Sequence, residues 1–107
     1  MDLLLTGRWM DPSEAARLGL VNEVWPDNAA LMERVWHIAR QLAAGPPLVF
    51  AAIKEVARAA ETLSFSDTMN LIAKKQFPTV KALYESDDQL EGAKAFAEKR
   101  DPVWRGK

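Results

Sequence analysis

Prolines and glycines cut most of this chain into short helical stretches, and their positions constrain its fold more than any other feature. From Asn28 onward, apolar residues return at helical spacing, which is typical of an amphipathic helix. The apolar stripe of this first stretch consists of Leu31, Val35, Ile38 and Leu42. Gly45-Pro46-Pro47 then breaks the helix, because proline lacks the amide hydrogen that a helix interior requires. The next helix is therefore expected to begin near Pro47.

Three further helical stretches follow that break. The first carries a second apolar face, formed by Val49, Ile53, Val56, Ala60 and Leu63. The next begins at Ser64, a good N-cap residue, and contains Pro78, so a kink is expected near residues 76–77. Ser86 and Gln89 have the spacing of a capping box, which predicts the start of a final helix.

The N-terminal quarter of the chain is expected to contain shorter elements. Residues 1–5 read as the last turn of a helix that begins upstream and is closed by Gly7, and a brief helix opens at Asp11-Pro12. Residues 20–25 alternate and are β-prone, which predicts one strand. Its partner is either residues 8–10 or sequence outside this chain. The expected fold class is mainly α, with about four to five helices and one or two short strands.

Composition and charge exclude several classes of function. The 107 residues suit one small domain, and a net charge of −1 offers no basic excess for a nucleic-acid partner. Since the chain has no cysteine, disulfides, thiolate metal sites and a cysteine nucleophile are ruled out, and a cytoplasmic location is expected. No apolar run is long enough for a signal peptide or a membrane span, so no membrane partner is expected.

The isolated titratable residues form no catalytic or metal-binding pattern. The only histidine, His37, falls on the polar face of its helix beside Glu33, where a solvated side chain is expected. Glu14 and Glu23 are expected to be isolated surface carboxylates. No acidic cluster has metal-ligand spacing, and no glycine-rich phosphate loop is present. We therefore assign no catalytic residue and no metal site to this sequence.

The stretch 91–107 contains the one cluster with binding chemistry. Phe96, Lys99 and Arg100 stand at i, i+3 and i+4, so a helix that continues to Asp101-Pro102 would place all three on one face. An aromatic ring beside an ammonium and a guanidinium group suits a nucleotide that carries phosphate. The alternative, which chemistry alone favours, is that Lys99 and Arg100 only complement the helix dipole, an effect of about 0.3–1 kcal/mol each.

Two sequence blocks, in the right order, resemble the crotonase family of enoyl-CoA hydratases and isomerases. The first block is Leu4-Leu5-Thr6-Gly7-Arg8, followed by Glu14-Ala15 and then Leu18-Gly19-Leu20-Val21-Asn22-Glu23-Val24. The second is Glu91-Gly92 with Ala95-Phe96-Ala97-Glu98-Lys99-Arg100-Asp101-Pro102-Val103-Trp104. With Phe77-Pro78 and Val80, this second block is most similar to the carnitinyl-CoA dehydratase branch.

The resemblance implies a division of the chain and a ligand. Residues 1–26 would be the end of the spiral core, and residues 27–107 a C-terminal helical oligomerisation (trimerisation) segment in a homotrimer or a dimer of trimers. Phe96 would lie against the adenine end of CoA and Lys99 near its 3′-phosphate, with Arg100 as an additional candidate for that phosphate. Such contacts often reach a CoA that is seated mainly in a neighbouring subunit.

The implied function is that of the C-terminal segment of an acyl-CoA hydro-lyase. The family carries its oxyanion hole and catalytic glutamates in an N-terminal spiral domain that no segment here matches, so the chain is expected to be catalytically incomplete alone. No prosthetic group is expected, and CoA enters as part of an acyl-CoA substrate. One alternative is a non-catalytic helical module that oligomerises or binds a protein, favoured by the amphipathic helices and four tryptophans. Another keeps the family but has isomerase or thioesterase activity.

Overall fold

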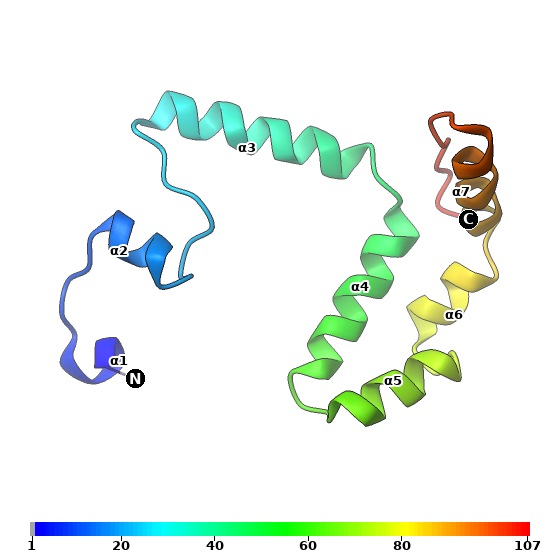
Figure 1. Cartoon of the computed structure of the whole chain (residues 1–107), viewed down its shortest axis with the longest axis horizontal. Helices are drawn as coiled ribbons and strands as arrows, with labels where there is room; N and C mark the ends of the chain where they lie inside the picture. Colours follow the sequence, from blue (N-terminus) through cyan, green and yellow to red (C-terminus); the bar gives the residue numbers. More distant parts are fainter. Residues whose placement is uncertain (1) are drawn as a thin grey trace. The chain divides into compact units, whose positions relative to one another are not determined.

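Helices account for all the regular secondary structure in residues 2–107, which are the residues that the structure, a computed structural model, describes (Figure 1). Side chains are described from residue 3 onward. The mainly α fold class expected from the sequence is confirmed, with seven helices in residues 2–107 instead of four to five. Contacts divide the chain into two compact units, Met1–Ala39 and Arg40–Lys107.

The first unit contains two short helices and most of a long one. Helix α1 spans Asp2–Thr6, α2 spans Pro12–Arg17 and α3 spans Asn28–Ala43. Glycines in the left-handed backbone region follow α1 and α2, at Gly7 (φ +61°) and Gly19 (φ +75°), as expected of helix C-caps. Asp11 caps α2, since its carboxylate accepts a hydrogen bond from the N–H of Glu14 at 2.8 Å.

The predicted strand at residues 20–25 does not form, and that expectation is wrong. Both this segment and residues 8–10 lack strand structure, so neither offers the other a ladder of hydrogen bonds. The Glu23 side chain in this segment bonds to two other side chains. Glu23 receives the guanidinium of Arg34 at 2.6 Å and the indole N–H of Trp25 at 3.1 Å. Its pKa is lowered, chiefly by the hydrogen bonds from Arg34.

The carboxylate of Glu14 is also paired. Arg8 approaches it with both terminal nitrogens, at 2.8 and 3.1 Å. This contact lowers the pKa of Glu14. The expectation that Glu14 and Glu23 are isolated carboxylates is therefore wrong, although both lie at the surface.

Helix α3 begins where the sequence predicts, but its apolar stripe is not covered. Asp27 accepts a hydrogen bond from the N–H of Ala30 at 2.8 Å and so caps the first turn. No residue of α3 is buried. The side chains of the stripe are between 36% and 56% exposed: Leu31, Val35, Ile38 and Leu42. The helix thus presents an apolar face that the side chains of residues 3–107 leave partly exposed.

The second unit is built on helix α4 (Pro47–Ala60), followed by α5 (Phe65–Ala73), α6 (Pro78–Tyr84) and α7 (Asp87–Glu98). Helix α4 packs against α5 and α6, and α6 packs against α7. The buried core consists of Ala52, Phe77 and Val80, with partly buried apolar neighbours around it. The predicted stripe of α4 is only partly buried, because the helix turns Ala52, Val56 and Ala59 toward the core and leaves Ile53 57% exposed.

Pro78 breaks the helix instead of kinking it. Helix α5 ends at Ala73, Lys75 takes a left-handed conformation, and Pro78 becomes the first residue of α6. Proline is tolerated there because the first N–H groups of a helix have no intrahelical partner. The N-terminus of α6 is capped from another helix: Glu55 on α4 accepts hydrogen bonds from the N–H of Thr79, at 2.9 Å, and from its hydroxyl.

Within residues 2–107, none of the helices combines the length and the apolar character needed to cross a membrane. Over the same range, His, Asp and Glu side chains form no group that could hold a metal ion.

Candidate functional site

Helix α7 carries the residues that the sequence singles out. Ser86 is its N-cap, since its hydroxyl accepts a hydrogen bond from the N–H of Gln89 at 3.2 Å. Only this half of the predicted capping box forms, because the N–H of Ser86 bonds to the carbonyl of Leu83 instead of the Gln89 side chain.

The C-terminus of α7 lies two residues earlier than expected. The helix ends at Glu98, and Lys99 adopts the left-handed conformation with φ +53°. The N–H of Lys99 bonds to the carbonyl of Phe96, and the N–H of Arg100 to that of Ala95 at 3.1 Å, which is a Schellman motif. The expectation that Phe96, Lys99 and Arg100 share one helical face is therefore wrong.

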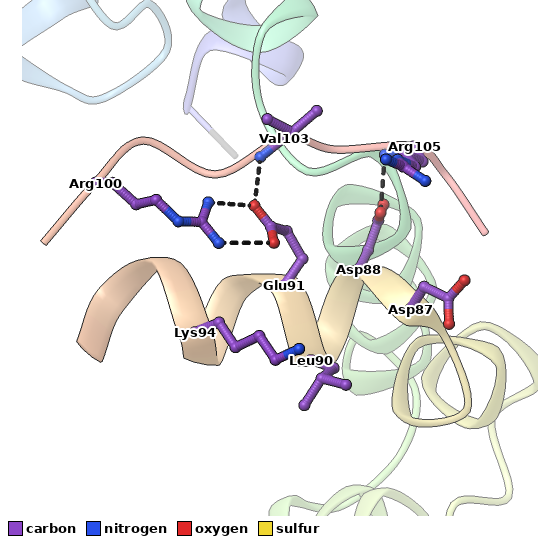
Figure 2. Close-up of a pocket in the computed structure, with 8 residues that line it drawn as sticks. All are labelled: Asp87, Asp88, Leu90, Glu91, Lys94, Arg100, Val103 and Arg105. Atoms are coloured by element: carbon purple, nitrogen blue, oxygen red, sulfur yellow. Dashed lines mark hydrogen bonds and ion pairs between the residues drawn. The ribbon is translucent and has the colours of Figure 1, made fainter. Parts of the chain in front are cut away.

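After this turn the chain runs back along α7, and residues 99–107, here called the tail, are fastened to the helix (Figure 2). Arg100 approaches Glu91 with two nitrogens, at 2.6 and 3.0 Å. The N–H of Val103 donates to the same carboxylate at 2.9 Å. The Nε of Arg100 also donates to Glu98 at 2.6 Å. Glu91 thus ties both the side chain of Arg100 and the backbone of the tail to the middle of α7.

A second carboxylate fastens the end of the tail to the start of α7. The two oxygens of Asp88 accept hydrogen bonds from the N–H groups of Arg105 and Gly106, each at 2.8 Å. Asp88 is only 3% exposed, so its charge depends on these bonds. In return, the carbonyl of Lys107 accepts from the N–H groups of Asp87 and Asp88, the first two of the helix.

Gly92 lets the tail lie close to the helix. A Cβ at this position would lie 3.2 Å from the indole ring of Trp104, which is tighter than an ordinary van der Waals contact. The glycine of the second sequence block therefore has a packing reason, since Trp104 occupies the space above it.

A mixed-charge pocket of about 440 Å³ lies between α7 and the tail. Figure 2 shows the eight residues that line it: Asp87, Asp88, Leu90, Glu91, Lys94, Arg100, Val103 and Arg105. Its electrostatics are dominated by the arginine–glutamate pair. The hydrogen bonds from Arg100 lower the pKa of Glu91 from 4.5 to about 2, and the two carboxylates Glu91 and Glu98 raise the pKa of Arg100.

The three predicted site residues have different surroundings. The Phe96 ring is 88% exposed, and Lys99 is exposed and makes no ion pair with another residue of the described range. All three guanidinium nitrogens of Arg100 donate to protein oxygens, on Glu91, Glu98 and Asp101. The structure thus brings Arg100 together with carboxylates, while Phe96 and Lys99 keep their functional groups available.

Sequence reasoning missed Asp88 and Glu91. A signal was present, because the two carboxylates stand at i and i+3 and therefore lie on one face of α7. The bonds from Asp88 and Glu91 to the tail form only because the tail folds back along α7, and the spacing of residues along the sequence does not predict this.

The chain resembles proteins of one family over its whole length. Residues 1–107 match the family described as enoyl-CoA hydratase/isomerase. A carnitinyl-CoA dehydratase of Citrobacter koseri is 43% identical over 109 residues, which cover 99% of this chain and 40% of that protein. A carnitinyl-CoA dehydratase of Salmonella typhimurium is 41% identical, and the match again covers 99% of this chain and 40% of that protein.

Solved structures agree with these sequence matches. The crystal structure of an enoyl-CoA hydratase from Bacillus anthracis superposes with a TM-score of 0.85 at 30% identity, over 99% of this chain and 39% of that one. The enoyl-CoA hydratase of Mycobacterium marinum superposes with a TM-score of 0.82 at 34% identity, over 100% of this chain and 40% of that one. The chain spans about 40% of the length of the curated relatives it matches and corresponds to a C-terminal segment of the crotonase-type fold. With its full length matched, the chain belongs to the enoyl-CoA hydratase/isomerase family.

Proposed function

We propose that this chain is the part of an acyl-CoA hydro-lyase, of the enoyl-CoA hydratase or carnitinyl-CoA dehydratase type, that supports oligomerisation and forms one wall of the CoA site. The named activities are those of its relatives. In this proposal the chain binds the nucleotide end of an acyl-CoA and does not transfer protons itself. Its carboxylates Glu14, Glu23 and Glu91 are engaged by arginines, which fits a structural role for each of them.

One observation carries the proposal: an exposed aromatic side chain and an ammonium group without an ion pair in residues 2–107 both lie at the C-terminal end of α7. Phe96 leaves 88% of its surface to water, although burying an aromatic side chain is strongly favourable. Lys99 is three residues further on, with no ion pair among residues 2–107. An adenine ring has a face that can stack on Phe96, and the 3′-phosphate of CoA supplies a charge for Lys99.

Arg100 is the less favourable of the two candidate phosphate ligands. To reach a phosphate, its guanidinium group would have to leave Glu91 and Glu98, and both carboxylates would repel the incoming anion. Lys99 has no such competitor among the described side chains. We therefore propose Phe96 and Lys99 as the direct CoA contacts.

The oligomerisation part of the proposal rests on exposed apolar surface. The apolar stripe of α3 forms a face that a second copy of the chain could cover, and Trp36, largely exposed on another side of the same helix, adds further apolar surface. This supports residues 27–107 as an oligomerisation segment, in a trimer or a dimer of trimers. The same face would also serve a non-catalytic module that only oligomerises. A cytoplasmic location is part of the proposal and is supported by the absence of cysteine.

Binding of CoA by matched variants tests the proposal. The double variant Phe96→Ala, Lys99→Ala removes both contacts, and the matched control is Phe65→Ala, Lys75→Ala. The control pair also consists of an exposed phenylalanine and a left-handed lysine at the end of a helix. Calorimetric titration with CoA should give an affinity about tenfold or more weaker for the first double variant, because base stacking contributes roughly 1–3 kcal/mol. The control should stay within about twofold of the unmodified chain.

Two results would overturn the proposal. One is equal affinity of the two double variants for CoA. The other is turnover of an enoyl-CoA by this chain alone, which would contradict the claim that the chain is catalytically incomplete. Sedimentation showing a compact monomer at the concentrations of the titration would contradict the oligomerisation part.

A further inference from the structure

The residues that attach the tail to α7 are not themselves among the proposed CoA contacts. Its parts, here called the tail clamp, are the side chains of Asp88, Glu91, Glu98 and Arg100 and the backbone N–H groups that they bind. We propose that Glu91 and Arg100 are positioning residues, which hold Lys99 in its left-handed conformation and so fix where its ammonium group meets the phosphate of CoA. This inference rests on the proposed function.

The first argument is that Lys99 needs external support for its backbone. A residue with a Cβ pays roughly 1–2 kcal/mol for the left-handed conformation, and glycine is the usual choice at this position of a Schellman motif. Lys99 adopts it with φ +53°. The residues on either side of it are bonded to each other, since Arg100 Nε lies 2.6 Å from Glu98 Oε2. Lys99 is therefore bracketed by an ion pair that spans it.

A second lysine in the chain shows a different solution to the same problem. Lys75 has φ +52° at the end of α5, where the N–H groups of Lys75 and Gln76 make the same Schellman bonds. Its own side chain lies over the ring of Tyr84, with Nζ 4.6 Å from the ring centroid, so its head group is engaged. At Lys99 the neighbours hold the backbone, and the head group stays available for a ligand.

The third argument is that the tail clamp holds the residues after Lys99 at two places along α7. Glu91 binds the side chain of Arg100 and the N–H of Val103, which closes residues 100–103 against the middle of α7. Asp88 fixes residues 105 and 106 further along. With the chain after the turn held at both places, little conformational freedom remains to be lost when a ligand binds, and such preorganisation raises affinity.

The charges of the pair also suit positioning better than direct binding. Arg100 is neutralised by Glu91 and Glu98, and its three nitrogens already have acceptors. It can therefore act on a phosphate only through the position of Lys99.

The test compares CoA with 3′-dephospho-CoA, so that the readout is the preference for the phosphate and not overall affinity. Unmodified chain should prefer CoA by about tenfold, and Lys99→Ala should abolish the preference. Glu91→Gln keeps Lys99 and the size of the side chain but removes the ion pair. It should reduce the preference at least about threefold, with affinity for 3′-dephospho-CoA unchanged. The matched control is Glu14→Gln, which removes the two-nitrogen pair with Arg8 in the other unit and should leave the preference intact.

Each remaining outcome decides between the two proposals. If the unmodified chain shows no preference for CoA, the proposed function fails. If Lys99→Ala abolishes the preference while Glu91→Gln keeps it, the positioning role is wrong and the proposed function stands. A Glu91→Arg, Arg100→Glu variant, which exchanges the two charges, keeps the test decisive if Glu91→Gln misfolds. The positioning role requires this variant to recover at least half of the preference for CoA over 3′-dephospho-CoA. A folded variant without any recovery would overturn the role.

Discussion

Glu55 on α4 closes the N-terminus of α6 by accepting hydrogen bonds from both the N–H and the hydroxyl of Thr79. Helix α6 has no side-chain cap of its own, because its N-cap residue is Phe77. The contact therefore replaces a local cap by one from a residue 24 positions earlier in the chain. It also explains how a helix can restart at Pro78 directly beside the core residues Phe77 and Val80.

Removal of this cap should destabilise the second unit. Glu55→Ala is expected to lower the free energy of unfolding by about 0.5–2 kcal/mol, the range measured for loss of an N-cap. Urea unfolding followed by circular dichroism measures the change. Glu61→Ala is the matched control, since Glu61 is exposed and follows the same helix without accepting a side-chain hydrogen bond. Equal stability of the two variants would contradict the capping role of Glu55.

The starts of the helices could be predicted from the sequence wherever the cap is local. Helix α3 begins at Asn28, α4 at Pro47 and α5 after Ser64, as expected, because the side chains of Asp27, Pro47 and Ser64 act within one turn. The break at Pro78 could not be predicted in the same way. Its cap comes from Glu55, and a long-range contact leaves no mark in local spacing.

The candidate site could be predicted only in part, for a related reason. The sequence places Phe96 correctly in the last turn of α7, but it also keeps Lys99 and Arg100 in the helix, which in the structure ends at Glu98. The left-handed conformation of Lys99 could not be predicted from its residue type, because the usual signal for that conformation is glycine. Once Lys99 turns the chain, Arg100 points to Glu91 instead of joining the other two.

Acid should release the tail from α7 through Glu91. The pKa of its carboxyl is lowered from 4.5 to about 2 by the hydrogen bonds from Arg100 and Val103. A lowered pKa in the folded state means that the ionised group stabilises the docked tail above pH 4.5, and this contribution is lost as the pH falls from 4.5 toward 2. A variant that keeps Trp104 and has phenylalanine in place of the other three tryptophans should show a fluorescence change in that range.

The control for this titration is Glu91→Gln in the same single-tryptophan background. Other carboxylates with lowered pKa values, such as Glu14 and Glu23, also become protonated in acid, so a change common to both proteins does not report on Glu91. The two curves should differ above pH 4.5, where Glu91 is ionised, and converge as the pH falls from 4.5 toward 2. Superimposable curves would contradict the role of Glu91 in docking the tail.

Asp88→Asn should weaken the attachment of the end of the tail to α7, although the two side chains are similar in size. Both oxygens of Asp88 accept backbone N–H groups, whereas asparagine has one oxygen and would turn an NH₂ group toward the second donor. Because the site is almost fully buried, the unsatisfied N–H should cost about 1–3 kcal/mol. Hydrogen exchange of the N–H groups of Arg105 and Gly106 measures the loss. Asp87→Asn is the control, since no hydrogen bond joins the Asp87 carboxylate to residues 99–107. Equal protection in the two variants would show that Asp88 does not hold these groups.

Lys99→Gly separates stability from ligand binding at the same position. Glycine adopts the left-handed conformation without the steric cost of a Cβ, so the variant should be more stable by roughly 0.5–1 kcal/mol, after part of the gain is offset by the freedom of glycine in the unfolded chain. It should nevertheless lose the preference for CoA over 3′-dephospho-CoA, because the ammonium group is gone.

The control is Lys75→Gly, which relieves the same backbone strain but also removes the cation–π contact with Tyr84. Its stability should therefore change less, and its preference for CoA should be retained. Thermal unfolding and the two titrations on both variants check these outcomes. A Lys99→Gly variant that is less stable than the unmodified chain would mean that the lysine side chain contributes to the fold. That result would contradict the proposal that Lys99 is kept free to bind a ligand.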